Sequence, residues 1–139
     1  MVILDTNVLS ALMRDEPDRT VATWLNEQSR ISIWTTSVTI MELSFGIEIL
    51  PAGNKRSHLT KLFEILLAEK VGERVASFDR VAAQHTADLM ASRYRSGRPT
   101  ELRDTMIAGI AIANHATVAT RNAPHFRDLS VPVINPWSP

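Results

Sequence analysis

The chain has 139 residues, of which 45% are hydrophobic and 22% charged, values typical of one globular domain with a single core. Its 15 basic and 15 acidic residues cancel, so nucleic-acid binding would need a local patch or a partner. Cysteine is absent, which excludes disulfides, thiol nucleophiles and thiolate zinc sites and suits a reducing cytoplasm. The longest uncharged stretch, residues 105–120, is shorter than the roughly 18 apolar residues of a membrane-spanning helix. We therefore expect one cytoplasmic domain over residues 1–139, without a membrane segment.

Short β-rich segments alternate with helical patterns along the first half of the chain. Apolar, β-branched runs indicate strands, and capping residues that follow them indicate helix starts. The first half therefore predicts a strand at residues 2–4, a helix capped by Asp5, a helix that begins after Pro17, a strand at residues 31–36, and a helix over residues 38–50 capped by Ser37.

The second half continues this alternation after a loop at residues 51–54. A long helix follows, and its apolar stripe is either core or an exposed groove for a partner helix; the stripe consists of Leu59, Leu62, Phe63, Leu66 and Leu67. The later expected elements are a strand at residues 74–78, a helix capped by Asp79 that ends over residues 96–100, a helix from Asp104 to about His115, a strand at residues 117–120, and an edge strand at residues 131–134 that contains Pro132. This order predicts an α/β fold, with a parallel sheet covered by helices on both sides.

Three acids interrupt apolar segments: Asp5 after the first expected strand, and Glu42 and Asp104 within expected helices. A carboxylate near a core must be hydrogen-bonded, paired, protonated or metal-bound, because a buried unpaired charge is costly. Ligands of parallel sheets bind beside the carboxyl ends of the strands, where both Asp5 and Asn122 fall. Three converging acids would form an oxygen-only site for Mg²⁺ or Mn²⁺.

Each acid also has a plainer interpretation. Asp5 can be a helix cap, and Asp104 can simply favour the positive N-terminus of its helix. Glu42 can be a partly exposed residue or can pair with a distant arginine. Glu42 shares one helical face with the apolar residues Val38, Phe45 and Ile49, so that face is expected to point inward.

The order and spacing of these segments resemble PIN-domain ribonucleases, and most closely the VapC-type toxins of bacterial toxin–antitoxin pairs. The resemblance covers nearly the whole chain, and the residues Asn135-Pro136-Trp137 are similar to the FitB-related branch. It rests on residues 2–7, residues 37–43 with Gly46, Phe78-Asp79, residues 104–108, residues 118–122 and Phe126. The resemblance implies a PIN-like α/β/α sandwich with a central parallel sheet of four to five strands, and metal-dependent endonucleolytic cleavage of RNA.

The resemblance also implies roles for individual residues. Asp5, Glu42 and Asp104 match the family's metal-binding acids, and all three are expected to serve catalysis with Mg²⁺ or Mn²⁺. Asn122 stands at a catalytic position where many members carry a fourth acid, and its neutral amide departs from that pattern. Thr6 and Thr120 match polar positions that line such sites, where we expect them to orient the acids.

Four arginines, Arg93, Arg95, Arg98 and Arg103, gather just before Asp104. They either contact RNA phosphates, for which Arg98 and Arg103 are the candidates, or cover a solvated helix end. The implied partners are an RNA substrate, a cognate VapB-type antitoxin, and a second copy of the chain in a homodimer and a larger toxin–antitoxin assembly.

Two other functions stay open. One is a weakly active PIN module that acts mainly in an antitoxin–toxin complex on operator DNA, because Asn122 replaces an acid. The other is a Mg²⁺-dependent phosphatase or phosphotransferase on an unrelated α/β fold, with Asp5 as the nucleophile.

Overall fold

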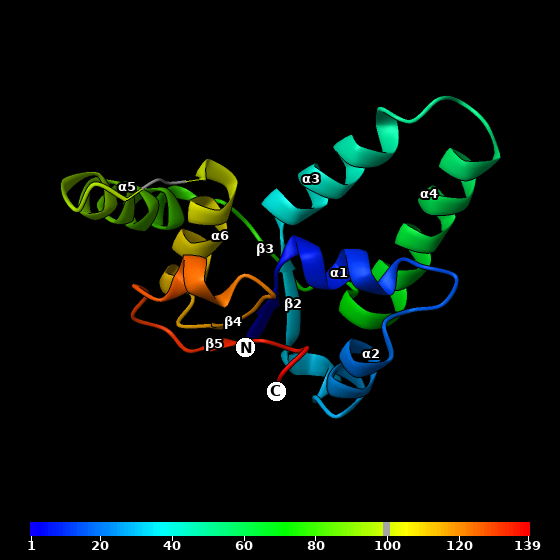
Figure 1. Ribbon diagram of the computed structural model, residues 1–139, viewed down its shortest axis with the longest axis horizontal. Coiled ribbons are helices and arrows are strands. Elements are labelled where there is room, and N and C mark those ends of the chain that lie inside the picture. Colours follow the sequence, from blue (N-terminus) through cyan, green and yellow to red (C-terminus); the bar gives the residue numbers. More distant parts are fainter. Residues whose placement is uncertain (99–100) are drawn as a thin grey trace.

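The computed structural model describes residues 1–98 and 101–139 and places a small sheet between two groups of helices (Figure 1). The strands are β1 (Val2–Leu4), β2 (Ile33–Thr36), β3 (Val75–Ala76), β4 (Thr117–Ala119) and β5 (Val133–Ile134). The α-helices are α1 (Thr6–Leu12), α2 (Arg19–Asn26), α3 (Ser37–Glu48), α4 (Asn54–Leu66), α5 (Arg80–Arg95) and α6 (Leu102–Ala113). Single turns of 3-10 or π type are η1 (Arg30–Ser32), η2 (Leu67–Val71) and η3 (Ala123–Phe126).

The five strands pair in the order β3-β2-β1-β4-β5, and every pairing is parallel. This confirms the predicted α/β fold with a parallel sheet. β5 lies at the edge of the sheet, as expected from Pro132, because proline cannot donate to a neighbouring strand. The central strand β1 is apolar on both faces, since Ile3 and Leu4 are both fully buried in different clusters of the core.

Helices cover both faces of the sheet (Figure 1). On one face, α5 and α6 bury a cluster that includes Ile3, Leu89 and Ile107. On the other face, α1 and α2 bury a cluster that includes Leu4 and Trp24. The arrangement is the α/β/α sandwich expected from the sequence, and it leaves the carboxyl edge of the sheet open to the starts of α1, α3 and α6.

The helix α4 resolves one alternative left open by its apolar stripe. Phe63 is buried with Met13 of the segment after α1 and Ile47 of α3, while Leu59 and Leu66 pack against the same cluster. Four of the five stripe residues, all except Leu62, therefore belong to the core or pack against it, because α4 folds back against α3 and the segment after α1.

The helix α3 differs from its prediction in two ways. Thr36, rather than Ser37, is its N-cap, since the Thr36 side chain accepts from the amide of Thr39. The predicted inward face holds for Val38 and Glu42 but is wrong farther along, because Phe45 and Ile49 are 58% and 65% exposed. α3 continues past the sheet, so the described chain leaves the end of that face uncovered.

Other element boundaries shift by a few residues. β2 begins at Ile33, because residues 30–32 form a 3-10 turn, and β3 keeps only two of its expected residues. The expected end of the fifth helix over residues 96–100 falls partly on residues 99–100, which lie outside the described residues; α5 itself ends at Arg95. No helix in the described ranges is long and apolar enough to cross a membrane.

The tight packing of α5 on α6 makes a test of the fold. A Cβ added at Gly109 would overlap the hydroxyl of Thr86 and lie 2.8 Å from the backbone oxygen of Ala82. We expect Gly109→Ala to lower the free energy of unfolding by roughly 2–3 kcal/mol, as in other overpacked cores. The matched control is Gly46→Ala on exposed α3, where no atom lies within 4 Å of the added Cβ.

Alanine at position 46 should raise the free energy of unfolding by about 0.5–1 kcal/mol, because alanine favours a helix over glycine. Urea titrations of both variants measure these changes. Equal stability of Gly109→Ala and the wild type would contradict the described α5–α6 contact.

Candidate active site

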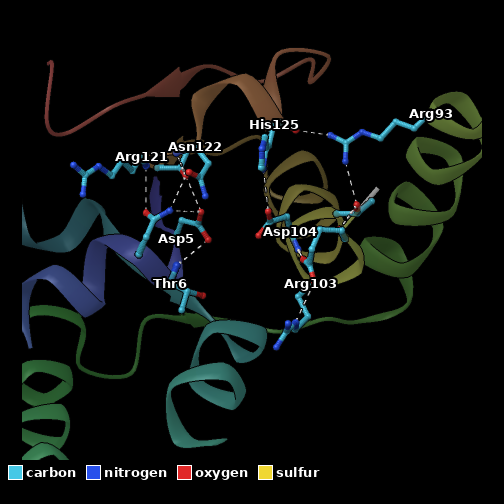
Figure 2. Close-up of polar contacts among 12 residues, drawn as sticks. Asp5, Thr6, Arg93, Arg103, Asp104, Arg121, Asn122 and His125 are labelled. Carbon is cyan, nitrogen blue, oxygen red and sulfur yellow. Dashed lines mark hydrogen bonds and ion pairs between the residues drawn. The ribbon is translucent and has the colours of Figure 1, made fainter. Parts of the chain in front are cut away.

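Residues from four segments meet at the carboxyl edge of the sheet. Asp5 follows β1 and caps α1, Thr36 is the last residue of β2 and caps α3, and Asn122 follows β4. Asp104 lies in the first turn of α6. Figure 2 shows Asp5, Asp104 and Asn122 on this one side, with the carboxylates of Asp5 and Asp104 facing each other.

Asp5 is the most buried acid of this group, with 2% of its surface exposed. The amide of Thr6 donates to Oδ1 at 2.8 Å, and the hydroxyl of Thr120 donates to Oδ2 at 2.7 Å. Burial, together with the negative charges of Asp104 and Glu42, raises the pKa of Asp5 to about 6, against the opposing effect of these hydrogen bonds. Two acids distant in sequence therefore act electrostatically on Asp5.

Glu42 is held toward Asp5 by a hydroxyl. The hydroxyl of Thr6 donates to Oε1 of Glu42 at 2.8 Å and lies 3.1 Å from the buried hydroxyl of Thr39. On its other side, Oε2 of Glu42 lies 3.7 Å from Nε of Arg103. The predicted pairing of Glu42 with an arginine is thus present beside its contact with the site.

Asp104 is partly exposed and stands at the positive end of α6. Its own amide donates to Oε2 of Glu101, the N-cap, at 2.8 Å, and its Oδ2 lies 3.5 Å from Nδ1 of His125. The start of α6 thus favours the negative charge of Asp104, because the first amides of a helix carry partial positive charge.

Asn122 and Thr120 flank Asp5 from the end of β4. The Thr120 hydroxyl is fully buried, and it accepts from the amide of Asn122 at 3.0 Å while it donates to Asp5. Asn7 also approaches both Asp5 and Thr120, with its side-chain nitrogen 3.4 Å from each. The amide group of Asn122 is exposed beside the carboxylates.

The arginines before Asp104 do not form one group. Arg93 is 5% exposed, and its guanidinium binds both oxygens of Asp128, the hydroxyl of Thr105 and the carbonyl of His125. The prediction that Arg93 belongs to an RNA-binding cluster is wrong, because these contacts hold its guanidinium inside the protein. Hydrogen bonds and charge from Arg93 also lower the pKa of Asp128.

The side chains of Arg98 and Arg103 are exposed. Arg98 lies 3.4 Å from the second oxygen of Asp128, and Arg103 donates to Glu101 at 3.2 Å and lies near Glu42. Both remain candidates for RNA contacts, although each already has a carboxylate neighbour.

The sequence did not single out several residues that the fold brings to the site. Thr39 and Glu101 lie in helix starts, and the His125 side chain arrives with η3. Asn7 was recognised only as part of a capping segment. Their common sequence signal is a polar residue next to a strand end or helix start, which is too frequent to identify a site by itself.

The oxygen atoms that surround Asp5 are of the kind that hard divalent cations bind. Its groups are carboxylate, hydroxyl and amide oxygens, and the raised pKa of Asp5 shows that the negative charge there is costly without a counter-charge. Within residues 1–98 and 101–139, no three Asp, Glu or His side chains come close enough together to form a ready ligand set. The acids repel one another, and Arg103 and His125 contact two of them.

The chain is similar to known proteins along nearly its whole length. Residues 2–131 match the family model described as the PIN domain. The chain is 37% identical to the VapC ribonuclease Y4jK of Sinorhizobium fredii over all of this chain and 99% of that protein. It is 31% identical to the toxin FitB of Neisseria gonorrhoeae, over 99% of each chain. A solved structure of FitAB bound to a DNA fragment superposes with a TM-score of 0.89 at 29% identity, covering 100% of this chain and 97% of that one.

The buried charge of Asp5 makes stability depend on pH. The folded protein holds the Asp5 proton more tightly than the unfolded chain, whose ordinary value is 3.8, so stability falls as pH rises from about 4 through about 6. In EDTA, we expect a loss of about 3 kcal/mol across this range that is absent from Asp5→Asn. Urea unfolding at several pH values measures the difference between the two proteins.

The control for this measurement is Asp88→Asn, at an exposed position of α5. It should follow the wild type at every pH. A wild-type advantage over Asp5→Asn that grows with pH would contradict the described burial of Asp5.

Proposed function

The chain belongs to the PIN-domain family and to its VapC-type branch, and on this premise we propose that residues 1–139 act as one domain, a metal-dependent endoribonuclease that serves as the toxin of a toxin–antitoxin pair. The observation that carries the chemistry is the buried carboxylate of Asp5, whose pKa is raised by burial and by Asp104 and Glu42. Family membership also argues against the unrelated-fold phosphatase, which required another architecture.

Asp5, Glu42 and Asp104 would hold Mg²⁺ or Mn²⁺ through their carboxylate oxygens. Such an ion, when bound, activates water and stabilises charge on a phosphoryl group. Thr120 and the amide of Thr6 fix the orientation of the Asp5 carboxylate, while the Thr6 hydroxyl directs Glu42 to the same place. These contacts reduce the reorganisation that catalysis would otherwise require.

In the proposed reaction, water attacks phosphorus in line with the leaving 3′-oxygen. The bond between phosphorus and that oxygen breaks, which leaves a 5′-phosphate on one fragment and a 3′-hydroxyl on the other. The exposed amide of Asn122 can hold a water or an RNA hydroxyl beside Asp5, since it offers both a donor and an acceptor. It adds no negative charge, which disfavours a tightly held second ion.

The proposed partners are a VapB-type antitoxin and a second copy of the chain, within a larger toxin–antitoxin assembly in the cytoplasm. The similar structure of FitAB on DNA supports an assembly of this kind. The exposed apolar residues Met41 and Phe45 on α3, and Ile49 at its C-cap, also support it, because uncovered apolar side chains on one helix favour association. The neutral chain suits a complex in which the partner supplies most DNA contacts.

Cleavage of total tRNA and of a structured RNA by antitoxin-free protein tests the activity. We expect discrete fragments in Mg²⁺ or Mn²⁺, none in EDTA, and a loss of at least about 100-fold in Asp5→Asn and Asp104→Asn. Both variants should stay folded, because asparagine has the shape of aspartate. Asp88→Asn should cleave like the wild type.

The alternative is a weakly active module that acts mainly in the DNA-bound complex, and Asn122 is the observation that favours it. Metal binding by calorimetry without cleavage by the wild type would select that alternative. Full activity in a clean preparation of Asp5→Asn would instead refute the proposed carboxylate chemistry.

Asn122→Asp tests the missing fourth acid. An added carboxylate near a dication is worth on the order of 1–2 kcal/mol even in water-like surroundings, so Mn²⁺ affinity should rise about tenfold. Calorimetric Mn²⁺ titrations measure this change, with Asn26→Asp at the exposed end of α2 as the matched control (Figure 1). Equal affinities of the two variants would show that position 122 does not contribute to metal binding.

A further inference from the structure

Arg121 is a cation near the site that has no role in the proposed reaction, and its side chain is held in place. Arg121 lies between the buried Thr120 and the exposed Asn122, at the end of β4. Its guanidinium carbon is 4.8 Å from the centre of the Trp137 ring, and its amide donates to Oδ1 of Asn7 at 3.2 Å. Its backbone is therefore anchored to Asn7, which contacts Asp5, while its guanidinium is held over Trp137 on the side of Asp5 away from Asp104 (Figure 2).

The tryptophan that supports Arg121 is itself held by the fold. The indole nitrogen of Trp137 donates to Oδ2 of Asp18 at 3.2 Å, and its amide donates to the side-chain oxygen of Asn135 at 2.9 Å. The ring also packs against the core cluster that contains Leu4. A guanidinium on such a ring loses less freedom when it binds a ligand than a free surface arginine does.

The charge of Arg121 is available to a ligand. Arg56, Arg93, Arg98 and Arg103 each lie within 4.0 Å of a carboxylate, whereas Arg121 makes no ion pair with any residue in ranges 1–98 and 101–139. An exposed guanidinium with free N–H groups matches the geometry of a phosphate, which accepts two hydrogen bonds from it.

The position of Arg121 would also offset the repulsion between the acids and the phosphates of RNA. Asp5, Glu42 and Asp104 repel the phosphate chain of RNA, so cations beside them are needed to hold the strand. Figure 2 shows Arg121 on the side of Asp5 away from Asp104, and Arg103 on the α6 side. A strand that crosses the acids would thus meet a cation on either side.

We propose that Arg121, held by Trp137, binds a backbone phosphate of the RNA next to the scissile one, on the β4 side of the acids. The inference rests on the proposed ribonuclease function. It identifies Arg121 as a substrate-binding residue and Trp137 as its positioning residue. The contact reads the phosphate chain, so it contributes affinity without base preference.

The experiment measures binding of a labelled single-stranded RNA by fluorescence anisotropy in Mg²⁺, over a series of KCl concentrations. Asp104→Asn is the background, which prevents cleavage during the titration. Within it, Arg121→Gln is compared with Arg127→Gln, an exposed arginine nearby in the sequence. Arg121→Gln should weaken binding about 5- to 10-fold and reduce the slope of log K against log[KCl] by about 0.7, the value of one single-strand phosphate contact. Arg127→Gln should change neither.

Trp137→Leu separates the charge from its support. The slope of log K against log[KCl] should stay near that of Asp104→Asn alone, because Arg121 keeps its charge. The affinity for RNA should fall several-fold. Trp137→Phe keeps an aromatic ring and should bind more tightly than Trp137→Leu. If the leucine variant does not fold, the pair at positions 121 and 127 decides the inference alone.

Two different failures can be told apart. If wild-type protein cleaves RNA but Arg121→Gln matches Arg127→Gln in affinity and slope, the phosphate contact is refuted and the ribonuclease stands. If the wild type neither cleaves nor binds RNA, the proposed function fails and this inference fails with it.

Discussion

The site depends on one carboxylate placed where a parallel sheet ends. Asp5 follows the central strand and is almost fully enclosed, yet it is held by a backbone amide and a threonine hydroxyl rather than by a basic side chain. Burial raises its pKa to about 6, and two further acids add to that effect. The fold therefore maintains a site that favours a proton or a cation, and the surrounding polar residues orient the group that would bind it.

Helix starts provide the remaining geometry. α1, α3 and α6 all begin near Asp5. Thr6 and Asp104 lie in the first turns of α1 and α6, and Glu42 lies in the second turn of α3. The buried Arg93 joins α5 and α6 to the segment after β4 through Asp128, Thr105 and the carbonyl of His125. That segment also contains Asn122, so a network outside the site stabilises the chain beside Asp104.

The helix α3 carries both a site acid and exposed apolar residues that favour association. α3 contributes Glu42 to the site, and farther along it exposes Phe45 and Ile49. A partner that covers the end of α3 would thus contact the helix that carries a site acid.

The sequence by itself determined the α/β class, most helix and strand positions, and the acids near the first strand and two helix starts. Those features are local: β-branched runs, capping residues and apolar periodicity reflect the chemistry of neighbouring residues. Only the tertiary structure decided that Arg93 is buried, that the outer face of α3 is uncovered, and that Arg121 stacks on Trp137. Each of these depends on segments far apart in the chain, and local patterns carry no information on which distant groups will pair.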